Sequence, residues 1–497
     1  MNMMMTESEE KEILKLCKSK LDSSSLIALP NIYKSKNNII KLLWFILSIS
    51  SAGLCSWFMA RSISDYLSYN VITKTEMKYN NVMKFPIITI CNLNSFATDS
   101  ANEYIKSIFN TTYPSMSGSI LATDLVKMFY NSTTTQEFGK RIDEFMIDCQ
   151  FGFNQCNLTE DFNHIYDISY GNCYRFNSES NMDGKPSRKK YGNAYNGFLE
   201  IELWIGQAKN NYNAFSKDNG YILFINEEIS NVINLNGISV SPGYATKIDL
   251  EKLTLIKKSK PYSDCLDDLS SIDSYGSLIY KKLFQLSKNE KYQLMSCYSV
   301  CIQKYVGDWC GCQSNYLFYI YYDKMRICLA NDTLIQQDLE CYAKVFDWVI
   351  RDANSFTRDC DCPIRCDYSG FSYSSSIAEY PTRQYSAYLM NNSLVKSMLN
   401  ESVSEMTSLE TYETLRKSVA RVEISFKDMI ETIITEYPKT EPYDLVSNIG
   451  GLLGLFLGLS CLSFIELFDL LIQIGFVLMA KKSSSKNTDK SQISQSI

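Results

Sequence analysis

The residues best suited to chemistry lie in one apolar stretch, residues 445–480, where Glu466 and Asp469 are the only charged side chains. As one helix this stretch would be about 54 Å long, whereas a bilayer core of about 30 Å needs only about 20 residues. We expect a break at Gly458-Leu459-Ser460, because small residues let a backbone turn or approach closely. Non-helical backbone at membrane depth must face protein or water, which is typical of a pore.

A simpler interpretation is one long membrane anchor with a helix-packing face. Gly450, Gly454 and Gly458 repeat at the four-residue spacing of a GxxxG motif, which lets two helices approach closely. This stretch alone leaves both interpretations open.

Cysteine is the second source of chemistry, with 17 residues in the chain. Fourteen of them lie between Cys91 and Cys366, an even number that would suit disulfides in an oxidising compartment. Short spacings such as Cys360-x-Cys362 also resemble zinc ligands. An extracellular placement favours disulfides, but spacing alone does not give their connectivity. The other three, Cys17, Cys55 and Cys461, lie in or beside the membrane-facing parts.

Composition argues against two classes of function. The net charge of −6 argues against nucleic-acid binding. His164 is the single histidine, and no nucleophile elbow or zinc motif accompanies it. We therefore expect no enzyme, no catalytic residue, no bound metal and no cofactor.

A second apolar run, residues 42–60, has no charge and is long enough to span a membrane. It starts too far from the first residue for a signal peptide, so we expect a retained span. Lysines flank the outer margins of both runs, which places both termini in the cytoplasm. All six glycosylation sequons fall between the runs, at Asn110, Asn131, Asn157, Asn331, Asn391 and Asn400.

The predicted organisation is a plasma-membrane protein with two spans and one large extracellular domain. Within that domain, residues 198–204 alternate apolar and polar side chains, as in a half-buried strand, and residues 221–225 and 422–426 also have the pattern of strands. Residues 339–351 and 394–409 have the pattern of helices. The fold class is therefore α+β, with a β-rich, disulfide-rich extracellular part. The expected boundaries are 1–38 cytoplasmic, 39–61 first span, 62–443 extracellular, 444–480 second span and 481–497 cytoplasmic.

Several motifs resemble the degenerin/epithelial sodium channel superfamily, over residues 23 to 469. Residues 85–92 read FPIITICN and match an FPxxTxCN motif, and residues 171–177 resemble a CYxFN motif. The Cys-x-Cys-Pro-x2-Cys element at 360–366 and Tyr380-Pro381 follow in the same order. The most specific match is residues 449–460, IGGLLGLFLGLS, with Glu466 shortly after.

The resemblance implies an amiloride-sensitive trimer, made of identical or related subunits, whose second spans line a sodium-preferring pore. It assigns Gly458, Leu459 and Ser460 to the selectivity filter, and Glu466 and Asp469 to acidic positions below it. A ring of carboxylates concentrates cations, while backbone carbonyls replace hydration water. Ser447 matches the position where bulky residues lock degenerins open, and the pore and gate set also includes Asn448, Gly450, Gly451 and Gly454.

The resemblance further implies how the ectodomain is held and coupled to the membrane. Tyr69 and Tyr262 match an aromatic pair that couples the two parts in acid-sensing members. The implied disulfides are Cys91–Cys173, Cys149–Cys156, Cys265–Cys366, Cys297–Cys362, Cys301–Cys360, Cys310–Cys341 and Cys312–Cys328.

The chain departs from the family at two places that concern gating. Ile27 and Ala28 stand where members carry His-Gly before the first span, so the subunit is expected to depend on partner subunits. Asn70 and Val71 replace a histidine pair of acid-sensing members, and only Asp347 of two acids is kept. The short extracellular domain and the composition rich in Asn, Lys and Tyr look more like those of invertebrate neuropeptide-gated members, so we expect a neuropeptide ligand. The alternatives are the same channel opened by protons, by mechanical force or constitutively, and a two-span receptor or adhesion protein that does not conduct.

Overall fold

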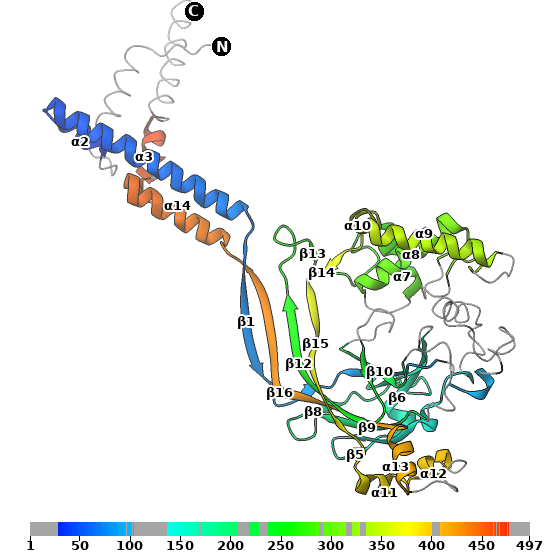
Figure 1. The fold of residues 1–497 in the computed structure, drawn as a ribbon. Helices are drawn as coiled ribbons and strands as arrows, with labels where there is room; N and C mark the ends of the chain where they lie inside the picture. The colour runs from blue at the N-terminus through cyan, green and yellow to red at the C-terminus, as the bar shows by residue number, and fades with distance from the viewer. Residues whose placement is uncertain are drawn as a thin grey trace, which may run out of the picture. The chain divides into compact units, whose positions relative to one another are not determined.

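The computed structural model describes residues 28–95, 97–101, 103, 137–167, 170–206, 218–227, 237–287, 292–314, 321–328, 334–399, 408–460, 462–463, 465–466, 468–474 and 476. These residues form two compact units (Figure 1). The first unit takes its residues from 1–72 and 437–497, and the second from 73–436.

The first unit consists of apolar helices. They are α2 (Ala28–Lys34), α3 (Asn38–Leu67) and α14 (Pro442–Leu457). The side chain of Asn37 caps α3 by accepting from the Ile39 N–H at 3.0 Å. Among the described residues, α3 is the one helix long and apolar enough to cross a membrane, with a mean hydropathy of 1.8 over its best window. It contains the predicted first span and continues to Leu67. The second predicted span is not one continuous helix, because α14 ends at Leu457.

The second unit is built on two β-sheets. The larger has the strand order β15-β12-β16-β9-β4-β5, with β1 pairing to β16, and the smaller has the order β11-β10-β3-β7-β6. Two short pairs, β2–β8 and β13–β14, complete the strands. The bounds are β1 (Val71–Tyr79), β2 (Met83–Lys84), β3 (Ile87–Asn92), β4 (Met146–Phe151), β5 (Asn154–Gln155), β6 (Phe162–Asp167), β7 (Gly171–Phe176), β8 (Tyr191–Gly192), β9 (Phe198–Trp204), β10 (Tyr221–Asn226), β11 (Ile238–Val240), β12 (Tyr244–Ile256), β13 (Cys265–Leu266), β14 (Ile364–Arg365), β15 (Asp367–Glu379) and β16 (Val419–Pro438).

The main hydrophobic core lies between the two sheets. Leu199, Ile201 and Leu203 of β9 are fully buried and share this core with Phe85 and with residues of β3, β10, β12 and β16. Their spacing of two residues puts them on one face of the strand. The alternation predicted for residues 198–204 is confirmed for the apolar positions, and the predicted strands at 221–225 and 422–426 lie in β10 and β16.

Helices gather in two places in the second unit (Figure 1). The helical lobe, as we name α7–α10 and the segments joining them between residues 265 and 366, has its own core around Tyr280, Val300 and Phe356. A second group, α11–α13, lies at the other end of the long strands. The helix predicted at 339–351 is part of α9. The pattern over 394–409 corresponds to the end of α12 and the start of α13, and residues 400–407 lie outside the described residues. The bounds are α6 (Leu158–Asp161), η3 (Ile142–Glu144), α7 (Leu278–Ser287), α8 (Leu294–Cys310), α9 (Ile335–Arg351), α10 (Ala353–Cys360), α11 (Arg383–Leu389), α12 (Ser393–Leu399) and α13 (Ser408–Arg416).

Candidate functional site

The second apolar stretch is interrupted at the predicted place. After Leu457, Gly458 adopts the left-handed conformation with φ of 68° and caps α14. The Gly458 N–H donates to the Gly454 carbonyl at 3.0 Å, and the Leu459 N–H donates to the Leu453 carbonyl at 3.2 Å. An L-residue at this φ would be strained, whereas glycine adopts it freely. The predicted break at Gly458-Leu459-Ser460 is confirmed.

Helical conformation resumes just after the break, and Ser460 caps the new start. The Ser460 N–H donates to Ser463 Oγ at 3.1 Å, and the Ser463 N–H donates to the Ser460 carbonyl at 3.0 Å. Residues 462–463, 465–466, 468–474 and 476 are helical. Glycine at a helix end and serine at a helix start are the residues that such positions favour. The sequence Gly-Leu-Ser therefore ends one helix and starts another within three residues.

One face of α14 packs on α3. The rings of Phe58 and Phe456 stack with their centroids 5.7 Å apart. The Ser51 hydroxyl donates to the Phe456 carbonyl at 2.5 Å, and the Cys55 thiol lies 3.7 Å from the Leu452 carbonyl as a weak donor. These contacts come from one helical face, since residues 452 and 456 are one turn apart.

The glycine face of α14 points away from these contacts. A Cβ added at Gly450 or Gly451 would meet no atom within 4 Å, and one at Gly454 would meet only the Leu459 carbonyl oxygen, at 3.6 Å. The GxxxG face therefore does not pack on α3 of the same chain.

The polar residues predicted for the pore flank the break on both sides. Ser447 and Asn448 are exposed on α14, before the break. Glu466 is exposed and Asp469 is half-buried after it. The Asp469 carboxylate accepts from Gln473 Nε2 at 2.9 Å. The two carboxylates are three residues apart, so they share one face of the resumed helix.

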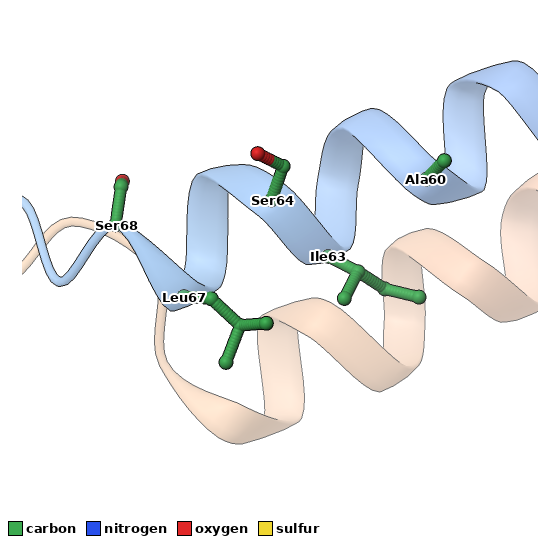
Figure 2. A pocket seen from close by; sticks show the side chains of 5 residues that line it. All are labelled: Ala60, Ile63, Ser64, Leu67 and Ser68. Atoms are coloured by element: carbon green, nitrogen blue, oxygen red, sulfur yellow. The ribbon is translucent and has the colours of Figure 1, made fainter.

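The first unit also has an open hollow along the end of α3 (Figure 2). It is lined by Ala60, Ile63, Ser64, Leu67 and Ser68. Figure 2 shows the Ile63 and Leu67 side chains pointing toward α14, while the Ser64 hydroxyl points the other way. Its lining contains no charged side chain, so the break in the second stretch is the stronger candidate site.

Comparison with known proteins identifies the family. Residues 21–470 match the family described as amiloride-sensitive sodium channel. This chain belongs to that family. The bile acid-sensitive ion channel of Homo sapiens is 22% identical over 470 residues, covering 90% of this chain and 84% of that protein. The degenerin-like protein asic-2 of Caenorhabditis elegans is 23% identical over 501 residues, covering 91% and 85%. A solved proton-activated chloride channel aligns over 88% of this chain and 100% of that chain, but with 7% identity and a TM-score of 0.32 it supports no inference.

The amiloride-sensitive sodium channel family consists of ion channels, not enzymes, and its match covers the break as well as the whole second unit. The expected disulfide framework can be compared directly. All fourteen cysteines between Cys91 and Cys366 are bonded, in the same seven pairs that the resemblance implies. Five of these disulfides lie in the helical lobe. Cys55 is buried and free.

The residues expected to couple the two parts of this channel protein lie in different units. Tyr69, at φ of 51°, follows α3, and its ring lies 6.4 Å from that of Tyr66. Tyr262 lies in the turn before β13, where its N–H donates to the Ser259 carbonyl at 3.1 Å. Ala28 begins α2, and Ile27 lies outside the described residues. Their role in gating stays a prediction.

The one acid retained from acid-sensing members is paired on its own helix. Arg351 Nε donates to Asp347 Oδ1 at 2.7 Å, and both side chains are largely exposed. Ala343, which stands at the position of the acid that is not kept, lies on the same helix, α9. The lone histidine is likewise engaged, since His164 Nε2 lies 3.1 Å from Asn172 Oδ1.

Two of the predicted glycosylation sites can be described. Asn157 and Asn391 are exposed, and Asn157 caps α6 by accepting from the Thr159 N–H at 3.1 Å. The other four, Asn110, Asn131, Asn331 and Asn400, lie outside the described residues.

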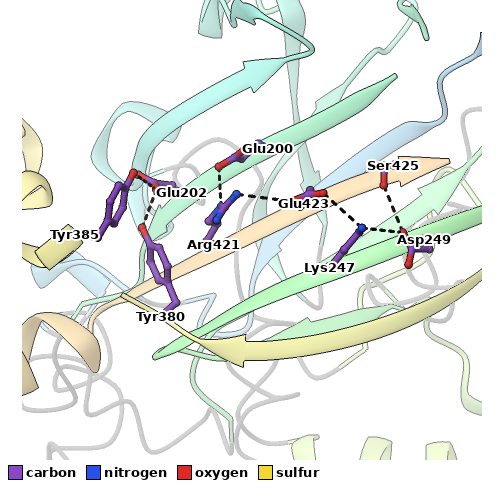
Figure 3. Close-up of polar contacts among 9 residues, drawn as sticks. All are labelled: Glu200, Glu202, Lys247, Asp249, Tyr380, Tyr385, Arg421, Glu423 and Ser425. Atoms are coloured by element: carbon purple, nitrogen blue, oxygen red, sulfur yellow. Dashed lines mark hydrogen bonds and ion pairs between the residues drawn. The ribbon is translucent and has the colours of Figure 1, made fainter. Parts of the chain in front are cut away.

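Sequence reasoning missed a buried carboxylate in the larger sheet (Figure 3). Glu202 of β9 is only 4% exposed, and its Oε1 accepts from the hydroxyls of Tyr380 at 2.8 Å and Tyr385 at 2.7 Å. Burial raises the pKa of the Glu202 carboxyl above its ordinary value, while the two hydrogen bonds oppose that shift. The nearby charges of Asp148 and Arg421 act on it in opposite directions. The carboxylate cluster, as we name Glu202, Tyr380 and Tyr385, ties α11 to the sheet.

From the carboxylate cluster a polar ladder runs across β9, β16 and β12 (Figure 3). Arg421 Nε lies 2.6 Å from Glu200 Oε1, and Arg421 Nη2 lies 3.6 Å from Glu423 Oε2. Lys247 lies 3.9 Å from Glu423 and 3.7 Å from Asp249. The three strands are thus joined by side-chain charges in addition to their backbone hydrogen bonds.

Proposed function

We propose that this chain is a subunit of a trimeric, sodium-selective, amiloride-sensitive cation channel of the plasma membrane. The observation that carries the proposal is the capped break at residues 458–460, on a helix whose glycine face does not pack on α3 in the described part of the chain. A helix that only anchors a protein in the membrane does not need to end and restart within the bilayer. A pore does, because interrupted backbone lining water can offer carbonyl groups to an ion.

In this proposal Gly458, Leu459 and Ser460 of three subunits form the constriction. Backbone carbonyls there would replace part of the hydration shell of sodium. Glu466 and Asp469, repeated three times, would hold cations on the cytoplasmic side of the constriction. The partners of this subunit are then sodium ions, amiloride-type blockers and either identical or related subunits.

The proposed topology has two spans with both termini in the cytoplasm. The first span is α3, and the second consists of α14, the break and the helical residues after it. The exposed positions of Asn157 and Asn391 support an extracellular location of the second unit, because N-linked glycans require accessible acceptor sites outside the cytoplasm.

We further propose that an extracellular neuropeptide opens the channel. Protons are the second candidate stimulus, and the carboxylate cluster is the observation that favours them. Glu202 is a buried acid whose pKa is raised by burial, so it would change charge at a milder acidity than an exposed carboxylate. Asp347, by contrast, is exposed and paired with Arg351 on its own helix.

The pore can be tested without knowing the stimulus if the channel carries a substitution that holds it open. We would express Ser447→Phe, a bulky change at the open-locking position, alone and together with related subunits, and record under voltage clamp. We expect an amiloride-blocked current that reverses near the sodium equilibrium potential. Adding Gly458→Ala strains the left-handed cap by roughly 1 kcal/mol, so the sodium-to-potassium permeability ratio should fall about fivefold.

Gly53→Ala is the matched control, because a Cβ at Gly53 of α3 would meet no atom within 4 Å. It should leave the permeability ratio unchanged. A protein that reaches the surface yet passes no current in any combination would overturn the channel proposal and favour a non-conducting receptor. Perfusing short amidated peptides, and separately acid, then distinguishes the two stimuli on the Ser447 wild-type subunit.

A further inference from the structure

Breaking the second span removes hydrogen bonds that a continuous helix would make, and one of them is at the Phe456 carbonyl. In a continuous helix the Phe456 carbonyl would accept from the N–H of Ser460, four residues on. That N–H instead donates to Ser463 Oγ at 3.1 Å. A carbonyl without a partner at membrane depth is costly, because lipid offers no donor. The break therefore needs a replacement donor for Phe456.

Ser51 of α3 supplies that donor. Its hydroxyl lies 2.5 Å from the Phe456 carbonyl oxygen. The stacked rings of Phe58 and Phe456 hold the two helices together one to two turns further along α3. The Cys55 thiol reaches the Leu452 carbonyl at 3.7 Å in the same contact, but a thiol is a weak donor.

A serine hydroxyl in a helix can also donate to a carbonyl of its own helix, and α3 contains an example. Ser48 donates to the Trp44 carbonyl at 2.6 Å, within its own helix. This back-bond to the fourth preceding residue is a common conformation for helical serine. Ser51, three residues later, donates across to α14 instead. The difference is the available acceptor, which the break creates.

From this contact we infer that Ser51 is a positioning residue for ion selectivity: it stabilises the broken form of the second span against the continuous helix. The inference rests on the proposed function, since it assigns selectivity to residues 458–460. Without the hydroxyl, the continuous helix gains one hydrogen bond relative to the broken form. The carbonyls of the constriction would then leave their positions more often.

The test compares variants in the Ser447→Phe background, with the permeability ratio as readout and surface labelling as a check on folding. Ser51→Ala should lower the sodium-to-potassium ratio about fivefold, the effect of one net hydrogen bond. Ser51→Thr keeps the hydroxyl and should restore the ratio. Ser48→Ala, which removes only an intrahelical bond, should leave the ratio unchanged. If Ser51→Ala fails to reach the surface, Ser51→Cys, a weaker donor, should give an intermediate ratio.

The two proposals fail in different ways. If the sodium-to-potassium permeability ratio is the same in Ser51→Ala and Ser48→Ala, the role of Ser51 is overturned and the channel proposal stands. The same holds if only Ser51→Cys reaches the surface and its permeability ratio equals that of wild type. Surface-expressed protein without current in every variant overturns the channel itself and the role of Ser51 with it.

Discussion

The helical lobe and strands β9, β12 and β16 of the larger sheet are held together by different chemistry. The lobe is crossed by five disulfides, including the adjacent pair Cys297–Cys362 and Cys301–Cys360. Strands β9, β12 and β16 contain no cysteine, and their side chains are joined by the polar ladder and the carboxylate cluster. Covalent links do not respond to acidity, whereas ion pairs and buried carboxylates do. A stimulus that changes charge would therefore act on the sheet, with the lobe as a rigid neighbour.

The largest loss of stability that we predict comes from removing the two adjacent disulfides of the helical lobe, and it tests whether covalent links hold the lobe together. Cys297–Cys362 spans 65 residues and Cys301–Cys360 spans 59, and the second loop lies inside the first. Replacing all four cysteines by alanine should cost about 3 kcal/mol, because only the wider loop closed by Cys265–Cys366, which spans 101 residues, then remains. Replacing either pair alone should cost less than about 1 kcal/mol, because the other pair keeps the loop closed.

Hydrogen exchange of the α10 amides in the full chain measures this difference. The quadruple variant should exchange on the order of a hundredfold faster, and each double variant less than about tenfold faster. Additive losses from the two pairs would mean that each disulfide fixes the lobe independently, and the covalent account of its rigidity would need revision.

The next effect tests whether the lobe also depends on charge. Arg326 donates to both oxygens of Asp338, at 2.7 and 2.6 Å, and the Asp338 side chain is 2% exposed. Arg326→Met removes both of these charge-assisted hydrogen bonds from a buried carboxylate, which should cost roughly 2 kcal/mol once the partial exposure of Arg326 is allowed for. The measurement is again exchange, at the amides of α9.

Arg351→Met is the matched control for that prediction. It breaks an ion pair of the same type on the same helix, but with both side chains largely exposed. Exposed pairs within one helix contribute about 0.3–0.5 kcal/mol. Equal losses from the two variants would show that burial does not distinguish these pairs.

The contrast between the regions also separates what the sequence could predict from what it could not. The alternation over residues 198–204 correctly places Leu199, Ile201 and Leu203 in the core. It also puts Glu202 on the solvent face, which is wrong: Glu202 is buried. Tyr380 and Tyr385, which cover it, come from nearly 180 residues further along the chain, and strand periodicity contains no information about such a partner.

The break shows the reverse case, because its causes are local. A glycine that can adopt positive φ and a serine that can cap a helix stand two residues apart, so Gly458 and Ser460 predict the interruption by themselves. The disulfide pairs, in contrast, follow from family resemblance and not from spacing. Ser51 was missed because the rotation of α3 against α14 decides which hydroxyl faces the Phe456 carbonyl. The apolar run within α3 has serines at 48, 50, 51 and 56, and the sequence does not indicate which of them that is.

The smallest effect that we predict is a pH-dependent change in stability at Glu202, in the larger sheet. Burial raises the folded-state pKa of Glu202, so the folded chain binds this proton more tightly than the unfolded chain. Stability from this site is therefore complete at pH below the unfolded-state pKa and is lost as pH rises through the folded-state pKa. Glu202→Gln keeps the volume and an acceptor for both tyrosines but does not titrate. We expect the variant to match wild type in acid and to unfold at a higher temperature at neutral pH.

Thermal unfolding of the full chain across a pH series measures this difference, with Glu251→Gln as control. Glu251 of β12 is about half exposed and pairs with Lys427, and such a surface pair contributes little. A Glu202→Gln curve parallel to wild type at every pH would mean that the carboxylate cluster does not titrate on folding. The same variant then decides the stimulus: if acid opens wild type and Glu202→Gln with equal midpoints, protons act elsewhere. If acid opens neither wild type nor Glu202→Gln, and an amidated peptide opens both, Glu202 is not a proton sensor. Its raised pKa is then only a consequence of burying the carboxylate that ties α11 to the sheet, because a group that titrates without changing the open probability does not gate the channel.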